Sequence, residues 1–148
     1  REVYAALKIS ADIERIGDYA SNVAKRSIVL NNSTAIPAAH RIARLAKTAN
    51  QILSDALKAY ADSDAELAMK VRDADAELDS QYTSYFRELL TYMMEDPRTI
   101  GSCTHLLFMA KNIERIGDHA TNIAENTYFV VHGELPKGER KKDDHTSE

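Results

Sequence analysis

The chain of 148 residues has one cysteine and few features of an exported, membrane-spanning or nucleic-acid-binding protein. Because a lone thiol cannot form an internal disulfide, Cys103 fits a reducing compartment and a buried, inert role. No run of about eighteen apolar residues predicts a membrane span, and the N-terminus lacks a basic-then-apolar signal pattern. The net charge of −4 excludes a strongly basic nucleic-acid footprint. We therefore expect a cytoplasmic protein.

No segment shows the alternation of a β-strand, so the sequence predicts an all-α fold. Apolar residues recur at helical spacing in four long segments, and the breaks between them are short. Short connections favour antiparallel neighbours. The predicted helices cover about 2–30, 36–61, 64–94 and 97–131.

Turn and capping residues mark the predicted helix ends. Ser63 with Glu66 forms a capping-box pattern for the third helix, and Asp96-Pro97 pairs an N-cap with a first-turn proline. Gly133 is expected to end the fourth helix. The charged residues that follow predict a disordered tail over 134–148.

A twelve-residue motif occurs twice in the chain. Residues 13–24 read Ile-Glu-Arg-Ile-Gly-Asp-Tyr-Ala-Ser-Asn-Val-Ala, and residues 113–124 read Ile-Glu-Arg-Ile-Gly-Asp-His-Ala-Thr-Asn-Ile-Ala. The copies are one hundred residues apart and share nine of twelve positions. Such internal similarity indicates a duplicated unit.

Each copy of the motif violates two preferences of α-helices. Gly17 and Gly117 lie inside the helical pattern, where glycine costs about 1 kcal/mol against alanine. The pairs Glu14/Asp18 and Glu114/Asp118 place like charges four residues apart, where they repel. Such violations are typical of functional sites, because a bound cation reverses the repulsion and glycine admits a close neighbour.

A second carboxylate pair with the same spacing lies on the third helix, at Asp75 and Asp79. If the third and fourth helices are antiparallel, Asp75 lies level with Asp118 and Asp79 with Glu114, so that four carboxylates converge. On a helical wheel Glu114 and Asp118 lie roughly 150° from the centre of the apolar stripe. We therefore expect the acids on an outer face or in a shallow groove made by small residues.

These residues form a candidate metal site, because hard cations and several transition metals accept carboxylate oxygens. The alternative is a solvated acidic face on which Arg15 and Arg115 pair with the acids. His119, which replaces Tyr19, fits a packing role better than a ligand role. The candidate ligands are Asp75, Asp79, Glu114 and Asp118, with Asn122 as a further one and Glu14 and Asp18 in the first copy.

The two motif copies resemble the signature of the PhoU family, bacterial regulators of phosphate uptake. Residues 75–82 and 94–97 resemble that family's middle-helix pattern and following turn, and the similarity covers roughly 1–133. The resemblance implies two three-helix repeats and metal clusters on the bundle surface. The ion would be iron, zinc, magnesium or calcium. It also implies repression of phosphate-starvation signalling through a phosphate transporter's ATPase and a sensor histidine kinase.

The chain departs from the family pattern because nothing before residue 13 matches residues 36–95. We expect a fragment: the last helix of a first repeat over 1–31 and a complete second repeat over 36–133. The first copy's metal site would then lack half of its ligands.

Two other functions are compatible with the sequence. A ferritin-like di-metal enzyme needs Glu-x-x-His on inward-facing helices, whereas Gly17 and Gly117 follow the two glutamates at that spacing. The second alternative is a purely structural helical bundle without metal. We expect a non-enzymatic adaptor, since no nucleophile with a base and no glycine-rich phosphate loop appears.

The helix over 2–30 has an apolar stripe that includes Ile9, Ile13 and Ile16, but no evident partner within the chain. A three-helix unit should already have a filled core. We therefore predict that this helix packs against another chain and that the protein is a homodimer or higher oligomer.

Overall fold

The computed structural model describes residues 1–33 and 35–138, and this part of the chain is helical without strands, as predicted. Its long helices are α1 (Glu2–Asn31), α2 (Arg41–Asp62), α3 (Ala65–Glu95) and α4 (Ile100–His132). The 3-10 turns η1 (Pro37–His40) and η2 (Pro97–Thr99) precede α2 and α4. No described helix is sufficiently long and apolar to cross a bilayer.

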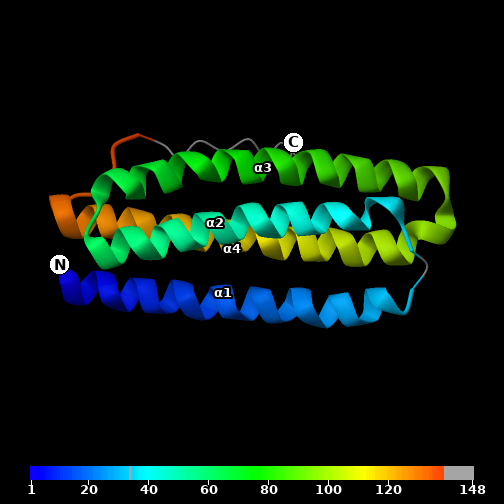
Figure 1. The fold of residues 1–148 in the computed structure, drawn as a ribbon, viewed down its shortest axis with the longest axis horizontal. Helices are drawn as coiled ribbons and strands as arrows, with labels where there is room; N and C mark the ends of the chain where they lie inside the picture. The colour runs from blue at the N-terminus through cyan, green and yellow to red at the C-terminus, as the bar shows by residue number, and fades with distance from the viewer. Residues whose placement is uncertain (34, 139–148) are drawn as a thin grey trace.

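Helix α4 is the central element, because it packs against each of the other three long helices (Figure 1). Helices α2, α3 and α4 form a bundle, and α1 lies along α4 on the side away from α3. The expectation that the first helix has no partner in its own chain is therefore wrong. Ala5, Ile9 and Ile16 of α1 are buried in the same core as the rest of the bundle.

Only one face of α1 is buried. Val3, Leu7 and Ile28 on α1 are 76%, 69% and 66% exposed, and Ile13 of the predicted stripe is 48% exposed. The helix thus carries apolar side chains beyond those that α4 covers. The predicted homo-oligomer stays a prediction.

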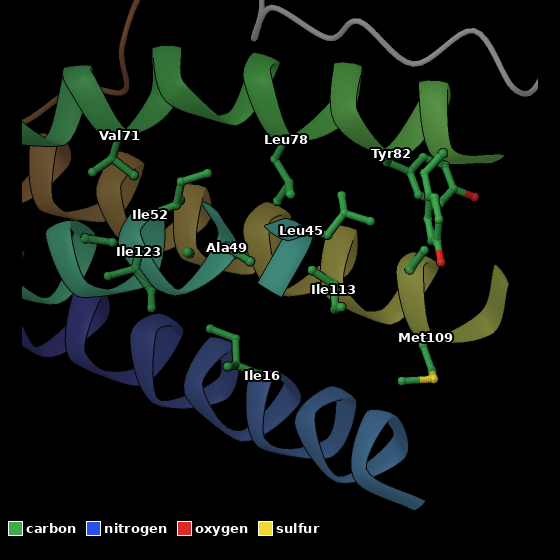
Figure 2. Packing of buried hydrophobic residues seen from close by; sticks show 14 of the residues in the cluster. Ile16, Leu45, Ala49, Ile52, Val71, Leu78, Tyr82, Met109, Ile113 and Ile123 are labelled. Carbon is green, nitrogen blue, oxygen red and sulfur yellow. The ribbon is translucent and has the colours of Figure 1, made fainter. Parts of the chain in front are cut away.

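The core runs the length of the bundle and contains large aliphatic and aromatic side chains from α3 and α4. Figure 2 shows Leu78 and Val71 pointing from α3 into the space between the helices, with Ile16 of α1 below. Cys103 is fully buried, as expected. Helix α2 packs against both α3 and α4. Its buried residues are Leu45, Ala49, Ile52, Ala56 and Ala59.

Most helix ends follow the sequence signals. Asp96 caps the turn that begins at Pro97, and Gly133, with φ of 76°, ends α4. The predicted capping box at Ser63 is wrong, because Ser63 adopts φ of 50° and terminates α2. Asp64 caps α3 instead, its Oδ1 accepting the Leu67 N–H at 2.9 Å. Residues 139–148 of the predicted tail lie outside the described part; before them, the carbonyls of Lys137 and Gly138 accept hydrogen bonds from Arg72.

The duplicated motif relates α1 and α4 by a local two-fold axis. Asn22 Nδ2 donates to Asn112 Oδ1 at 3.3 Å, and Asn122 Nδ2 donates to Asp12 Oδ1 at 3.3 Å. The two bonds join equivalent positions of the two copies, because Asn22 corresponds to Asn122 and Asn112 corresponds to Asp12. The rings of the equivalent residues Tyr19 and His119 lie 5.6 Å apart, near this axis. The two copies therefore pack on each other as antiparallel equivalents.

We predict that Tyr85→Phe destabilises the bundle. Tyr85 is fully buried, its hydroxyl donates to the buried Ala38 carbonyl at 3.0 Å, and burial raises the pKa of its phenol. Leaving that carbonyl without its donor should cost about 1–2 kcal/mol in the free energy of unfolding, measured by urea titration. Tyr60→Phe, at a position 36% exposed, is the control and should change it by less than about 0.5 kcal/mol. Equal effects of the two substitutions would contradict this account.

A carboxylate cluster between α3 and α4

Three aspartates from two helices meet at the α3–α4 interface. Asp75 and Asp79 of α3 and Asp118 of α4 each have an oxygen within 4.8 Å of the others. Four-residue spacing places Asp75 and Asp79 on one face of α3, one turn apart. Both are fully buried, and Asp118 is half-buried. The predicted facing of the two helices thus occurs, and these three residues are the carboxylate cluster.

Glu114 lies one turn before Asp118 and is also buried, at 2% exposure. Its Oε1 accepts a hydrogen bond from Lys111 Nζ at 2.7 Å. Lys111 Nζ lies 5.1 Å from the ring centre of Tyr82 on α3, so this ion pair belongs to the same interface. Glu114 is not one of the three residues with mutually close oxygens. It adds a fourth acid at the edge of the cluster, together with a compensating ammonium.

The expectation that these acids lie on an outer face or in a shallow groove is wrong. Helix α4 is central, so the face opposite its apolar stripe meets α3 rather than solvent. Small residues on this second face keep the helices close: Ala110, Gly117 and Ala124 are all buried. The wheel argument assumed one buried face, whereas a helix enclosed by three others has more than one.

Gly117 allows α3 to come close to the backbone of α4. A Cβ atom at this position would lie 2.4 Å from Leu78 Cδ2 and 3.0 Å from Asp75 Oδ1. At the equivalent Gly17 of α1, no atom of the described residues outside the helix's own backbone lies within 4 Å of such a Cβ. Among the described residues, therefore, only Gly117 makes a close contact with a neighbouring helix.

The other candidate ligands lie away from the cluster. Glu14 and Asp18 are exposed on α1, where Arg15 pairs with Asp18 at 3.7 Å. Asn122 donates to Asp12 of α1, and His119 Nδ1 lies 2.8 Å from Asp12 Oδ1. His119 therefore packs between the helices, as the sequence favoured, and it also contacts Asp12.

Asp12 is a functional candidate that the sequence argument missed. It is 9% exposed and lies between the buried residues Ile9 and Ile16 on α1. An ionisable residue at buried helical spacing was a usable signal. Its carboxylate holds two side chains of α4, so it helps to fix α1 against the central helix.

The donor set fits a cation. The three oxygens lie within 4.8 Å of one another, a spacing that one ion can span, since metal–oxygen bonds to calcium are about 2.3–2.6 Å long. All three donors are carboxylates. Carboxylate ligands suit hard cations, and also iron or manganese, better than sulfur ligands do. An ion there would bind to α3 and α4 at once.

Comparison with known sequences agrees with the motif. The family profile described as "PhoU domain" matches residues 1–27 and 42–127. The chain belongs to the PhoU family. The family resemblance drawn from the duplicated motif is therefore confirmed.

Several PhoU relatives are much longer than this chain. It is 57% identical over 147 residues to the phosphate-specific transport system accessory protein PhoU homolog of Xylella fastidiosa and 54% identical over 149 residues to that of Rhizobium meliloti. The alignments cover 99% of the chain and 62% of each relative. The chain thus spans about three fifths of these relatives.

The fold also matches solved PhoU structures. PhoU from Pseudomonas aeruginosa superimposes with a TM-score of 0.87 at 38% identity, over 90% of this chain and 65% of that one. The phosphate transport system regulatory protein PhoU from Streptococcus pneumoniae gives 0.77 at 26% identity, over 91% and 64%.

We predict opposite effects of alanine at the two motif glycines. Gly117→Ala should lower the free energy of unfolding by about 1–3 kcal/mol, because Leu78 and Asp75 must move. Gly17→Ala should raise it by up to about 1 kcal/mol, because helix propensity improves in open space. Urea titration of both variants measures the difference. A gain of stability in both would show that α3 does not need the glycine.

Proposed function

We propose that this chain is part of a non-enzymatic, metal-binding regulator of phosphate uptake that represses phosphate-starvation signalling. Its partners would be the ATPase of a phosphate transporter and a sensor histidine kinase. Family membership supports the regulatory role, since the relatives are named as accessory proteins of a phosphate-specific transport system. The convergence of Asp75, Asp79 and Asp118 within 4.8 Å supports the metal site.

In this proposal the cation joins two helices. Asp75 and Asp79 would hold it from α3 and Asp118 from α4, with Glu114 nearby at 2% exposure. The ion supplies positive charge that offsets the mutual repulsion of clustered carboxylates. Iron, zinc, magnesium and calcium are the candidates, and the all-carboxylate donors favour the harder ions.

The ferritin-like enzyme is the weaker alternative even though the acids are buried. The buried carboxylates of α3 and α4 face each other, as the inward-facing ligands of that class do. Ligand type still separates the two classes. Gly117 occupies the position at which a Glu-x-x-His ligand pair from Glu114 needs histidine, and it is packed against Leu78.

Metal titration tests the site directly. Chelator-treated wild type should take up metal in calorimetric titration, and Asp79→Asn should weaken uptake by at least about tenfold, because it removes a buried ligand charge. Asp18→Asn, at the exposed equivalent pair on α1, is the matched control and should bind as wild type does. If wild type and both variants show the same negligible uptake, the chain is a structural bundle without metal.

Partner binding needs a separate experiment. The purified chain, immobilised, should retain the transporter ATPase and the cytoplasmic part of the kinase from purified preparations. An unrelated helical bundle of similar charge serves as the control. Retention of neither protein, with metal added or removed, would contradict the proposed partners and leave the metal site unaffected.

A further inference from the structure

A second polar site lies on the other side of α4, between α4 and α1. It is a cavity of about 500 Å³ whose lining includes Asn22, Lys25 and Arg26 of α1 and His105, Asn112 and Arg115 of α4. We call it the cationic groove. Three of these residues carry a permanent positive charge, and no acidic residue lines the groove.

Neighbouring side chains hold several groove residues in place. The Arg26 guanidinium lies 4.1 Å from the centre of the Phe108 ring, and its Nη1 lies 3.2 Å from His105 Nδ1. The exposed Asn22 donates through Nδ2 to Oδ1 of the buried Asn112 at 3.3 Å, so this hydrogen bond joins the two helices in the groove. Arg26 and Asn22 are thus held by neighbouring side chains before any ligand arrives, which lowers the entropic cost of binding.

The positive charges of the groove lack carboxylate partners. Within residues 1–33 and 35–138, Lys25, Arg26 and Arg115 form no ion pair. The chain as a whole has an acidic excess, with a net charge of −4. Cations gathered in a cavity repel one another, and an anion bound among them would remove that repulsion.

The local two-fold axis provides an internal comparison. It places an equivalent cavity of about 560 Å³ at the other end of the α1–α4 contact, lined in part by Lys8, Asp12, Asn122, Glu125 and Asn126. Lys25 corresponds to Glu125, Arg26 to Asn126 and Asn112 to Asp12. The duplication thus produced two similar cavities whose equivalent positions differ in charge. The helix packing alone therefore does not require the positive charge of the cationic groove.

The dimensions indicate a small ligand. The α1 side spans Asn22 to Val29, about 10 Å at 1.5 Å per residue. A volume of about 500 Å³ falls in the range of small-molecule sites. A stable protein interface buries about 800 Å² on each partner, which is a much larger surface than a groove of this length offers. A carboxylate carries one charge, but a phosphate group carries about 1.5–2 charges and three acceptor oxygens, which match several converging donors.

We propose that the cationic groove binds a phosphate-bearing anion, either inorganic phosphate or the phosphate group of a small organic ester. Arg26, Arg115 and Lys25 supply the charge, and Asn22 supplies an amide donor. The site is separate from the carboxylate cluster, because it lies on the α1 side of α4 rather than the α3 side. It does not depend on bound metal.

Calorimetric titration of the full chain with inorganic phosphate and with adenosine monophosphate, in the presence of a chelator, tests the proposal. The variant Lys25→Glu/Arg26→Asn carries the residues of the equivalent cavity and should weaken binding at least about tenfold, since two groove charges are lost. Lys8→Ala, in the equivalent cavity, is the control and should bind as wild type does. Asp79→Asn should also bind normally, which separates this site from the metal site.

The side-chain amide signals of Asn22 and Asn112 in NMR spectra locate the ligand. Shifts of these signals on titration support the groove, and tighter binding of one ligand identifies the free anion or the ester. If the double variant fails to fold, the single variant Lys25→Glu, at an exposed position, should still weaken binding several-fold. No binding by wild type, equal binding by the groove variants, or loss of binding in Asp79→Asn would overturn the proposal.

Discussion

The contact of α3 with α4 at Gly117 determines where the carboxylates of this protein meet. Because no side chain projects from Gly117, Leu78 and Asp75 occupy the space that a Cβ atom would need. This approach places Asp75 and Asp79 beside Asp118, inside the bundle. Glycine lowers the stability of the helix itself, but at this position it permits a close contact between two helices.

Helix α4 can hold this cluster because it is enclosed by the rest of the fold. Its apolar stripe contributes Ile113 and Ile123 to the core, while the opposite face meets α3 through small residues and acids. Its contact with α1 carries the pair of asparagine hydrogen bonds and two equivalent cavities, of which the cationic groove has the positive lining. One helix therefore separates two polar environments, an acidic one toward α3 and a basic one toward part of α1.

The two copies of the motif are similar in sequence, but their acids and glycines have different surroundings. Asp118 is half-buried against α3, whereas Asp18 is exposed and pairs with Arg15. Gly117 is packed, and Gly17 is open. The chain covers 62% of the length of its relatives, and the described residues place no helix on the outer face of α1. The expected division of residues 1–31 and 36–133 between two repeats stays a prediction.

Much of this structure could be predicted from local sequence signals. The helix ends at Asp96-Pro97 and Gly133 follow from capping chemistry, and the facing of Asp75 and Asp118 follows from four-residue spacing on antiparallel helices. The burial of the acids could not be predicted in this way, because hydrophobic periodicity identifies one face and a central helix has several. The start of α3 was misplaced because Ser63 and Asp64 are both good caps, and only the left-handed backbone of Ser63 distinguishes them.

The packing of α1 on α4 was not predicted, because a three-helix unit was expected to have a filled core without it. In the structure Ile9 and Ile16 of α1 complete that core, and Asp12 between them binds His119 and Asn122 of α4. Similarly, the charge difference between Lys25 and Glu125 is visible in the sequence. Its meaning appears only when the two-fold relation places both residues in equivalent cavities.

The central claim is that the cluster of Asp75, Asp79 and Asp118 is a cation site. Anomalous diffraction from crystals grown with a transition metal such as iron, collected at that metal's absorption edge, tests it most directly. This account predicts a peak between α3 and α4 within bonding distance of all three carboxylates. A peak only at the exposed Glu14 and Asp18 of α1, or no peak at the cluster at saturating metal, would contradict it.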